Sequence, residues 1–352
     1  MARPDDPLTG RSGEGWHPEP ELLDIRDQEA SRPALEALGE GAWSAALDYV
    51  YDHGMERAIG APADYEELRS LFFGPTGTPG AAPVEPSTSA QLLDEFRTRL
   101  APHQANAWHP RAYAYFTPIP LWASITGEIL GQVVHKGVDV WHCSPSATVV
   151  EEEVVRWLCD LVGYSEGSFG LFTSGGVMAN IMAMNVARDV HLRRVRELDG
   201  PPRGADLAGA RVYVSDQAHF SIKRSLDTLG FPEGTLVQVP ADEHLRLQAA
   251  PVAAAIARDR AAGLTPFAIG ATAGTTNTGA VDVLPDLAEV AEREGLWFHV
   301  DAAYGGAARL SQRLAPVVDG LERADSITID PQKWFFQAYD IGGLLVRDGA
   351  LL

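Results

Sequence analysis

The sequence is poor in cysteine and in positive charge. Only Cys143 and Cys159 occur in 352 residues, too few for a disulfide framework and, by themselves, too few for a metal site. The 28 Lys and Arg residues face 48 Asp and Glu residues, so the formal net charge is −20. Nucleic acid and anionic membrane surfaces bind clustered positive charge, so we expect neither as a partner.

The sequence also lacks a long apolar run. Its start, MARPDDPLTGRSGEGWHPEP, has no apolar core of a signal peptide, and no other window approaches the apolar length of a membrane span. With 45% hydrophobic and 22% charged residues, the composition is that of a folded globular protein. We therefore expect a cytoplasmic protein whose two thiols are reduced.

The character of the sequence changes along the chain. Residues 1–30 are polar and rich in Pro and Gly, which predicts a poorly ordered segment. Residues 31–105 show helical patterns, among them a helix that Ser89 can cap and Pro102 ends. From about residue 125 onward, helical patterns alternate with seven β-rich runs, at 170–174, 211–216, 235–240, 266–274, 296–301, 326–330 and 342–347. Such alternation indicates an α/β fold with a mostly parallel sheet covered on both faces.

Ligands of open α/β sheets bind at the carboxyl ends of the strands, so the residues after each run are candidates for a site. Gly175 and Gly176 precede a helix; they can open backbone N–H groups to an anion, or simply make a tight turn. Asp301 follows an apolar run, where a buried carboxylate needs a partner such as a protonated ring nitrogen; it could instead cap a helix. His219 could stack on a planar ligand, or be a structural histidine.

Lys333 follows the run SITID and is followed at once by Trp334, Phe335 and Phe336. A lysine removed from water by apolar neighbours becomes a nucleophile toward aldehydes. The alternative is a lysine whose ammonium reaches water past an aromatic patch. An anion cradle, an acidic partner for a ring nitrogen, a stacking His and a reactive amine together meet the needs of pyridoxal 5′-phosphate. We therefore predict this cofactor.

Five segments in this order, HPRAYAYFTPIP, TSGGVMAN, SDQAHFS, HVDAAYGG and DPQKW, resemble the group II pyridoxal-phosphate-dependent amino-acid decarboxylases. This family includes aromatic-L-amino-acid, glutamate and histidine decarboxylases. The resemblance covers residues 105–352 and is looser over 20–105. It implies a large domain of fold type I, the aspartate aminotransferase-like fold with a mostly parallel seven-stranded sheet, over residues 106–352. It also implies a helical dimerisation segment over 31–105, and a homodimer that binds a small-molecule amino-acid substrate at its interface.

The resemblance assigns roles to individual residues. It implies three catalytic residues: Lys333 holds the cofactor as an imine, His219 stacks on its ring, and Asp301 binds its ring nitrogen. The implied cofactor-binding set is Gly175, Gly176, Val177, His219, Thr276, Asp301, Ala303, Gln332 and Lys333. In the family, the segment that matches Tyr115, Phe116 and Thr117 lines the substrate pocket, and its aromatic character favours an aromatic substrate. We expect no metal.

The sequence departs from the family pattern in three places. Gln332 stands where the family usually has His, and its amide can donate to a phosphate without carrying charge. Val177 stands where relatives often supply a hydroxyl. Members of the family continue far beyond the lysine, so we expect a C-terminally truncated chain. The missing part would hold the small domain and a mobile loop, whose tyrosine is implicated in protonating the carbanion.

The activity implied by the resemblance is decarboxylation of an L-amino acid to the amine and CO2 through the Lys333 imine. Three alternatives stay open: oxidative decarboxylation–deamination to an aldehyde, decarboxylation of glutamate, and a cofactor-binding fragment without catalysis. In the family, the residue that discriminates the first alternative lies in the mobile loop.

Overall fold

The computed structural model describes residues 28–352 except 53, 55, 58, 61–62, 77, 79, 81–86, 114 and 117. Thr117 and most of the segment predicted to be poorly ordered therefore lie outside the described residues. The chain divides into two compact units, Met1–Ala114 and Tyr115–Leu352; the large domain is predicted to begin at residue 106. Within the described part of the chain, no helix is both long and apolar enough to cross a membrane.

The secondary-structure elements described in the first unit are all helices. Its helices are α1 Gln28–Leu47, α2 Tyr65–Phe73 and α3 Ser89–Glu95. Thr88 caps α3, because its side-chain oxygen accepts from the Gln91 N–H at 3.2 Å and the Gln91 side chain accepts from the Thr88 N–H at 2.8 Å. The prediction of Ser89 as the cap was wrong by one residue. This reciprocal pair satisfies two N–H groups that the start of a helix otherwise leaves free.

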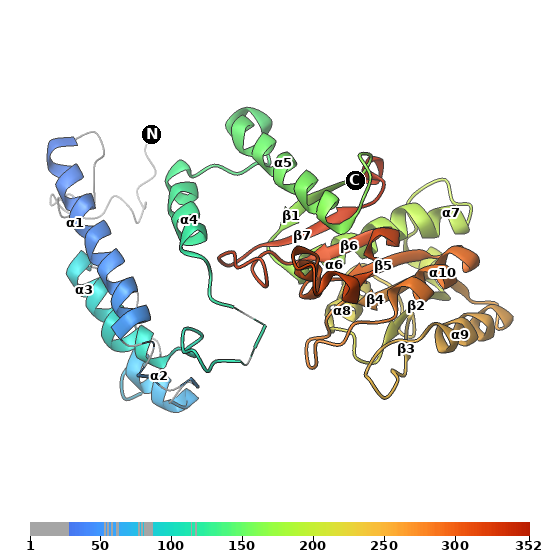
Figure 1. The fold of residues 1–352 in the computed structure, drawn as a ribbon, viewed down its shortest axis with the longest axis horizontal. Coiled ribbons are helices and arrows are strands. Elements are labelled where there is room, and N and C mark those ends of the chain that lie inside the picture. Colours follow the sequence, from blue (N-terminus) through green and yellow to red (C-terminus); the bar gives the residue numbers. More distant parts are fainter. Residues whose placement is uncertain are drawn as a thin grey trace, which may run out of the picture. The chain divides into compact units, whose positions relative to one another are not determined.

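The second unit contains one sheet of seven strands (Figure 1). The strands are β1 Phe169–Thr173, β2 Ala210–Ser215, β3 Leu236–Val239, β4 Thr265–Thr272, β5 Trp297–Asp301, β6 Ser326–Ile329 and β7 Gly342–Val346. Their order is β1-β7-β6-β5-β4-β2-β3, in which only β7 runs antiparallel to its neighbours. Each strand overlaps one of the predicted runs. The predicted α/β fold with a mostly parallel seven-stranded sheet is confirmed.

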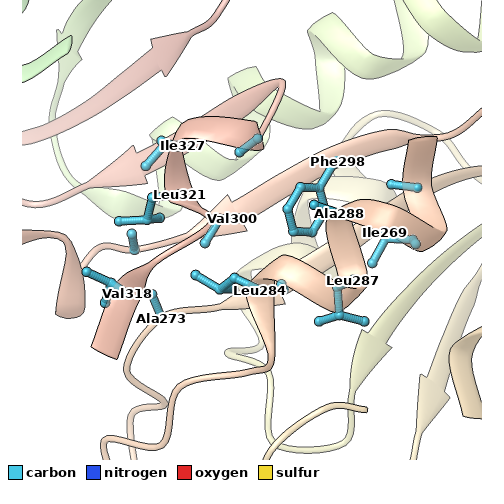
Figure 2. Close-up of a cluster of buried hydrophobic side chains, with 14 of the residues drawn as sticks. Ile269, Ala273, Leu284, Leu287, Ala288, Phe298, Val300, Val318, Leu321 and Ile327 are labelled. Carbon is cyan, nitrogen blue, oxygen red and sulfur yellow. The ribbon is translucent and has the colours of Figure 1, made fainter. Parts of the chain in front are cut away.

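Helices pack on both faces of this sheet. The helices of the second unit are α4 Trp122–Val134, α5 Pro145–Val162, α6 Gly176–Val186, α7 Arg193–Val195, α8 Ser221–Thr228, α9 Ala249–Ala261 and α10 Leu284–Glu294. Residues of α5, α9 and α10 form one buried cluster with the strands, and residues of α6 and α8 form a second. Figure 2 shows part of the first cluster, where Leu284 and Leu287 lie beside Phe298 and Val300.

Alternation along two central strands separates apolar from polar side chains. The first cluster takes the apolar positions Phe298, Val300, Ile327 and Ile329. Successive side chains of a strand point to opposite faces. The positions between them therefore face α6 and α8, and these are Trp297, His299, Asp301, Ser326 and Thr328. A row of polar side chains consequently lies buried under α6.

Candidate functional site

Asp301 lies at the carboxyl end of β5, where the sequence predicts a site. Its carboxylate is buried, and both of its oxygens accept hydrogen bonds. Oδ2 accepts from the Asn180 Nδ2 atom of α6 at 2.9 Å, and Oδ1 accepts from the Ala303 backbone N–H at 3.2 Å. These bonds compensate for the water that a buried carboxylate loses. Asn180, which the sequence analysis did not select, thus becomes part of the site.

His219 is half-buried at the turn between β2 and α8. Its Nδ1 atom lies 2.8 Å from Ser221 Oγ and accepts from the Ser221 backbone N–H at 3.3 Å. Burial lowers the pKa of His219; the positive charges of Lys333 and Arg224 act in the same direction, and the Asp301 carboxylate opposes them. The structure therefore brings the imidazole into one electrostatic environment with both Asp301 and Lys333.

The Lys333 amine is turned toward a buried carboxylate. Its Nζ atom lies 3.1 Å from Asp330 Oδ2, and only 17% of the lysine side chain is exposed. The ring centroid of Phe116 is 5.3 Å from the same nitrogen. Two of the aromatic residues after the lysine pack on neighbouring rings: the ring centroids of Trp334 and Tyr304 lie 4.4 Å apart, and Phe335 contacts Trp157. This arrangement favours the interpretation of a reactive amine over that of a lysine extended into water.

Asp330 is a residue of the site that the sequence analysis missed. It is 2% exposed, and its Oδ1 atom has no hydrogen-bond partner among the described residues. Burial raises the pKa of Asp330 to about 6; the charge of Lys333 opposes this shift and that of Asp301 adds to it. A polar residue directly after an apolar strand was the available signal, and Asp301 was selected on that same signal.

The glycine turn lies against Asp330. Gly175 has φ 134°, and Gly176 begins α6. A Cβ atom at Gly176 would lie 2.7 Å from Asp330 Oδ2, and one at Gly342 would lie 2.4 Å from the carbonyl carbon of Gly175. Close approach of the three segments thus requires glycine at these positions. The amino end of α6, with Val177 in its first turn, lies beside Asp330. In the turn, the Gly175 N–H donates to Thr173 Oγ1 at 3.3 Å, and the Gly176 N–H interacts with the Asp330 carboxylate.

The backbone of Ile341, directly before β7, orients the side chain of Gln332. It is buried, and its Oε1 atom accepts from the Ile341 N–H at 2.8 Å. Because the carbonyl oxygen is held there, the amide nitrogen faces the other way, 3.8 Å from where a Cβ atom of Gly175 would be. The side chain therefore points a neutral donor at the glycine turn.

The remaining predicted residues make fewer contacts with Lys333, Asp301 and Asp330. Ala303 is buried, and its carbonyl accepts from the Asp330 N–H at 3.2 Å, which ties it to the site. Thr276 is exposed in the turn after β4, and Tyr115 is 79% exposed. Over the described ranges, no hydrogen bond or ring contact joins either of these two residues to Lys333 or Asp301. Nor does the described part of the chain hold a group of three or more His, Cys, Asp or Glu that could bind a metal.

This sheet, with an amine, an imidazole and two carboxylates at the carboxyl ends of its strands, defines an α/β cofactor-binding domain. Residues 75–352 match the family described as pyridoxal-dependent decarboxylase conserved domain, and the chain belongs to this family. The predicted family and its cofactor, pyridoxal phosphate, are confirmed.

Relatives with different substrates resemble the chain to a similar degree. Aromatic-L-amino-acid decarboxylase of Bacillus atrophaeus is 32% identical over 322 residues, which cover 92% of this chain and 63% of that protein. L-2,4-diaminobutyrate decarboxylase of Rhizobium meliloti is 34% identical over 310 residues, 86% of this chain and 60% of that protein. Cysteine sulfinic acid decarboxylase of Homo sapiens is 31% identical over 323 residues, 90% of this chain and 62% of that protein. The chain thus spans roughly three fifths of the length of these relatives.

Solved structures agree with the fold. The glutamate decarboxylase domain of diaminobutyrate-pyruvate transaminase and L-2,4-diaminobutyrate decarboxylase from Vibrio parahaemolyticus superimposes with a TM-score of 0.81 and 30% identity. The superposition covers 90% of this chain and 68% of the chain in that structure. Oryza sativa TDC with PLP gives a TM-score of 0.78 and 26% identity, and covers 90% of this chain and 67% of that one.

Proposed function

We propose that this chain binds pyridoxal phosphate at the carboxyl ends of β5 and β6 and serves an L-amino-acid decarboxylase that releases the amine and CO2. The observation that carries the proposal is the position of Lys333, a largely buried amine beside Asp330 and in the electrostatic range of His219 and Asp301. An amine, an acid for a ring nitrogen and a stacking group are needed together, and each comes from a different strand end.

The residues fit the cofactor. The amide nitrogen of Gln332 would be a neutral donor for a phosphate at the amino end of α6. The Gly175 and Gly176 N–H groups would donate to the phosphate in exchange for their bonds to Thr173 and Asp330. Val177 would add its backbone N–H. The unpartnered Oδ1 atom of Asp330 faces the same turn, and a proton on this carboxyl would make it a donor as well.

The cofactor, when bound, supplies a ring that withdraws electrons from the substrate Cα as CO2 leaves. Asp301 would hold a proton on the ring nitrogen, which keeps the ring electron-poor. Lys333 would hold the aldehyde, and His219 would cover one face of the ring. Ala303, under Asp301, leaves room for the ring because its side chain is small. Thr276, exposed after β4, is proposed to contact cofactor or substrate on the open side.

Proton transfer at Lys333 falls to Asp330. An amine must lose its proton before it attacks an aldehyde. The Asp330 carboxylate, 3.1 Å from Nζ, is the group placed to take that proton and to return it when the amine is released. Both groups are largely removed from solvent, so the exchange does not depend on bulk water.

An aromatic amino acid is the substrate that we favour. The Phe116 ring lies next to the Lys333 amine, and Tyr115 precedes it; Thr117 completes the proposed substrate-binding segment. Rings pack on rings in offset or edge-on arrangements, so an aromatic substrate side chain would gain contacts with this segment.

A second copy of the chain is the proposed partner. α4 has no buried residue, and its apolar side chains are largely open: Ile129 is 52%, Leu130 63%, Val133 79% and Val134 63% exposed. Apolar residues of α5, among them Val150 and Trp157, are about half exposed. Apolar area of this kind is usually covered in an assembly. A homodimer in which α4, directly after the substrate segment, meets its partner would place the site at the interface.

The chain offers a sharp test because it has three lysines, Lys136, Lys223 and Lys333. Pyridoxal phosphate added to the purified chain should give a visible absorption band. Borohydride reduction followed by peptide mapping should place the label on Lys333, and K333A should lose both. Label on Lys136 or Lys223, which are exposed, would overturn the proposed site.

Product analysis then decides the reaction. Amine and CO2 from aromatic amino acids support decarboxylation. Aldehyde and peroxide would favour the oxidative reaction, since phenylacetaldehyde synthase of Arabidopsis thaliana is 33% identical over 282 residues, 77% of this chain and 55% of that protein. Label on Lys333 without any product would assign cofactor binding to this chain and turnover to a longer one.

A further inference from the structure

A continuous row of hydrogen bonds lies behind Asp301, on the α6 face of the sheet. Ser326 Oγ is 2.9 Å from both Trp297 Nε1 and His299 Nδ1. His299 Nε2 in turn lies 3.0 Å from Asn180 Oδ1. All four side chains are buried. Because these residues come from β5, β6 and α6, the row crosses two strands and ends on a helix.

The direction of the bonds in this row follows from the Asp301 carboxylate at its end, which can only accept. Asn180 Nδ2 donates to Asp301, so Asn180 Oδ1 faces His299 Nε2 and needs a donor there. The proton of the imidazole is therefore on Nε2, which donates to Asn180 Oδ1. Burial lowers the pKa of His299 to about 4, so that the ring is neutral near pH 7. Near pH 7, His299 therefore donates from Nε2 to Asn180 and accepts at Nδ1 from Ser326 Oγ without changing its charge.

The Asn180 amide is held in one orientation by partners on both of its sides. Its Oδ1 atom accepts from His299 and, at 2.6 Å, from the Thr328 hydroxyl. The amide nitrogen must then lie on the other side, where it donates to Asp301 Oδ2 at 2.9 Å and to Ser221 Oγ at 2.8 Å. Both amide hydrogens and both acceptor positions of the oxygen are used. In a flipped amide, the NH2 group would face the donors of His299 and Thr328, and the oxygen would face the Asp301 carboxylate.

The same amide nitrogen also sets His219. Ser221 Oγ accepts from Asn180, so its own proton is available for His219 Nδ1 at 2.8 Å. The Ser221 backbone N–H points to this ring nitrogen too. Nδ1 is thus an acceptor, and the neutral imidazole bears its proton on Nε2. One nitrogen atom of Asn180 therefore orients a carboxylate from β5 and an imidazole that precedes α8.

We propose that Asn180 is a positioning residue for the cofactor: through Asp301 it aligns the carboxylate that faces the ring nitrogen, and through Ser221 it aligns the imidazole that covers the ring. The inference rests on the proposed function, because it assigns Asn180 a role only if Asp301 and His219 meet a pyridine ring. A network that merely satisfies buried polar groups would stabilise the fold without discriminating between ligands.

The test compares two cofactors on the full chain. Asn180→Ala should weaken binding of pyridoxal phosphate at least about tenfold, the effect of losing a hydrogen bond to a charged group. With the 1-deaza analogue, which lacks the ring nitrogen, the same substitution should cost less than about threefold, since only the His219 arm remains. Tyr164→Phe is the control: it removes the buried bond from the Tyr164 hydroxyl to the Ala324 carbonyl, 3.0 Å, at the opposite end of the strands. It should leave both affinities within about twofold.

A milder substitution keeps the inference testable if Asn180→Ala does not fold. Thr328→Val keeps the side-chain volume and removes one of the two donors to Asn180 Oδ1. It should weaken pyridoxal phosphate about threefold and leave the affinity for the 1-deaza analogue unchanged. Equal losses for the two ligands with either variant, or no loss, would overturn the role of Asn180. Failure of the unaltered chain to capture pyridoxal phosphate on Lys333 would instead overturn the proposed function, and the inference with it.

Discussion

The Lys333 amine lies 3.1 Å from the carboxylate of Asp330, three residues before it in the chain, and the two form a largely buried ion pair. Asp330 is in turn pressed against the glycine turn that begins α6. One carboxyl group thus lies beside both the Lys333 amine and the glycine turn that is proposed to hold the phosphate. Charge on that group must affect the stability of the chain, the reactivity of the lysine and the binding of an anion together.

Asp330→Asn should flatten the pH dependence of stability in the cofactor-free chain. The folded-state pKa of Asp330 is raised to about 6 from an ordinary value of 3.8. The folded chain thus binds this proton more tightly than the unfolded chain, and the free energy of unfolding falls as the pH rises from about 4 to about 6. Removing the carboxyl should remove about 2 kcal/mol of that fall.

Urea unfolding at several pH values measures this effect. Asp286→Asn is the matched control, because Asp286 is an exposed residue in the first turn of α10. Its curve should stay parallel to that of the unaltered chain. Parallel curves for Asp330→Asn as well would contradict a buried, proton-binding Asp330.

The same substitution should slow the reaction of Lys333 with pyridoxal phosphate. Asparagine cannot take the ammonium proton, so formation of the visible band should become at least about tenfold slower. Stopped-flow absorbance gives the rate, and borohydride mapping verifies that Lys333 is still the labelled residue. An unchanged rate would show that water, and not Asp330, removes the proton.

Because the Gln332 amide does not titrate, we expect position 332 to add no pH dependence to the affinity for the phosphate. Gln332→Ala should weaken pyridoxal phosphate about tenfold, because one oriented donor is lost. Gln332→His should bind more tightly at about pH 6 than at about pH 8, since an imidazolium adds charge near the phosphate only below its pKa. Fluorescence titrations at both pH values make the comparison. The titration of Asp330 contributes to the pH dependence of both proteins, so the test is the difference between them. The same change of affinity between the two pH values in Gln332→His and in the unaltered chain would place the phosphate elsewhere.

Gly342→Ala should destabilise the fold because a Cβ atom there would lie 2.4 Å from the backbone of Gly175, which cannot rotate away. We expect a loss of about 3 kcal/mol in the free energy of unfolding, measured by urea denaturation. Gly167→Ala is the control, since its Cβ atom would meet nothing within 4 Å. Comparable stability of the two variants would mean that β7 does not approach the glycine turn this closely.

Val133→Glu should disrupt the proposed dimer. Val133 is 79% exposed on the apolar side of α4, and a charge there would have to be buried against the second copy. Sedimentation velocity should show a shift from dimer to monomer at micromolar concentration. Glu128→Gln, on the same helix, should leave the dimer intact. A monomeric unaltered chain would refute the partner assignment directly.

The seven strands were predictable from the sequence because each is a short apolar run bounded by turn residues. Asp301, His219 and Lys333 were also predictable as candidates, since parallel strands bring their carboxyl ends to one edge. Local sequence determines these features. The roles of Thr276 and Tyr115 came from the family resemblance, and the structure leaves both residues exposed.

Only the tertiary structure selected Asn180. It lies 121 residues from Asp301 and 119 from His299 along the chain, in a helix whose other positions are mostly apolar. The alternating polar residues of β5 and β6 were visible in the sequence, but not the register that sets His299 against Ser326 and Asp301 against Thr328. A buried polar atom must find a partner, and the sequence states that need. Which partner meets it depends on the distance and direction between elements, and these exist only once the sheet and α6 have packed together.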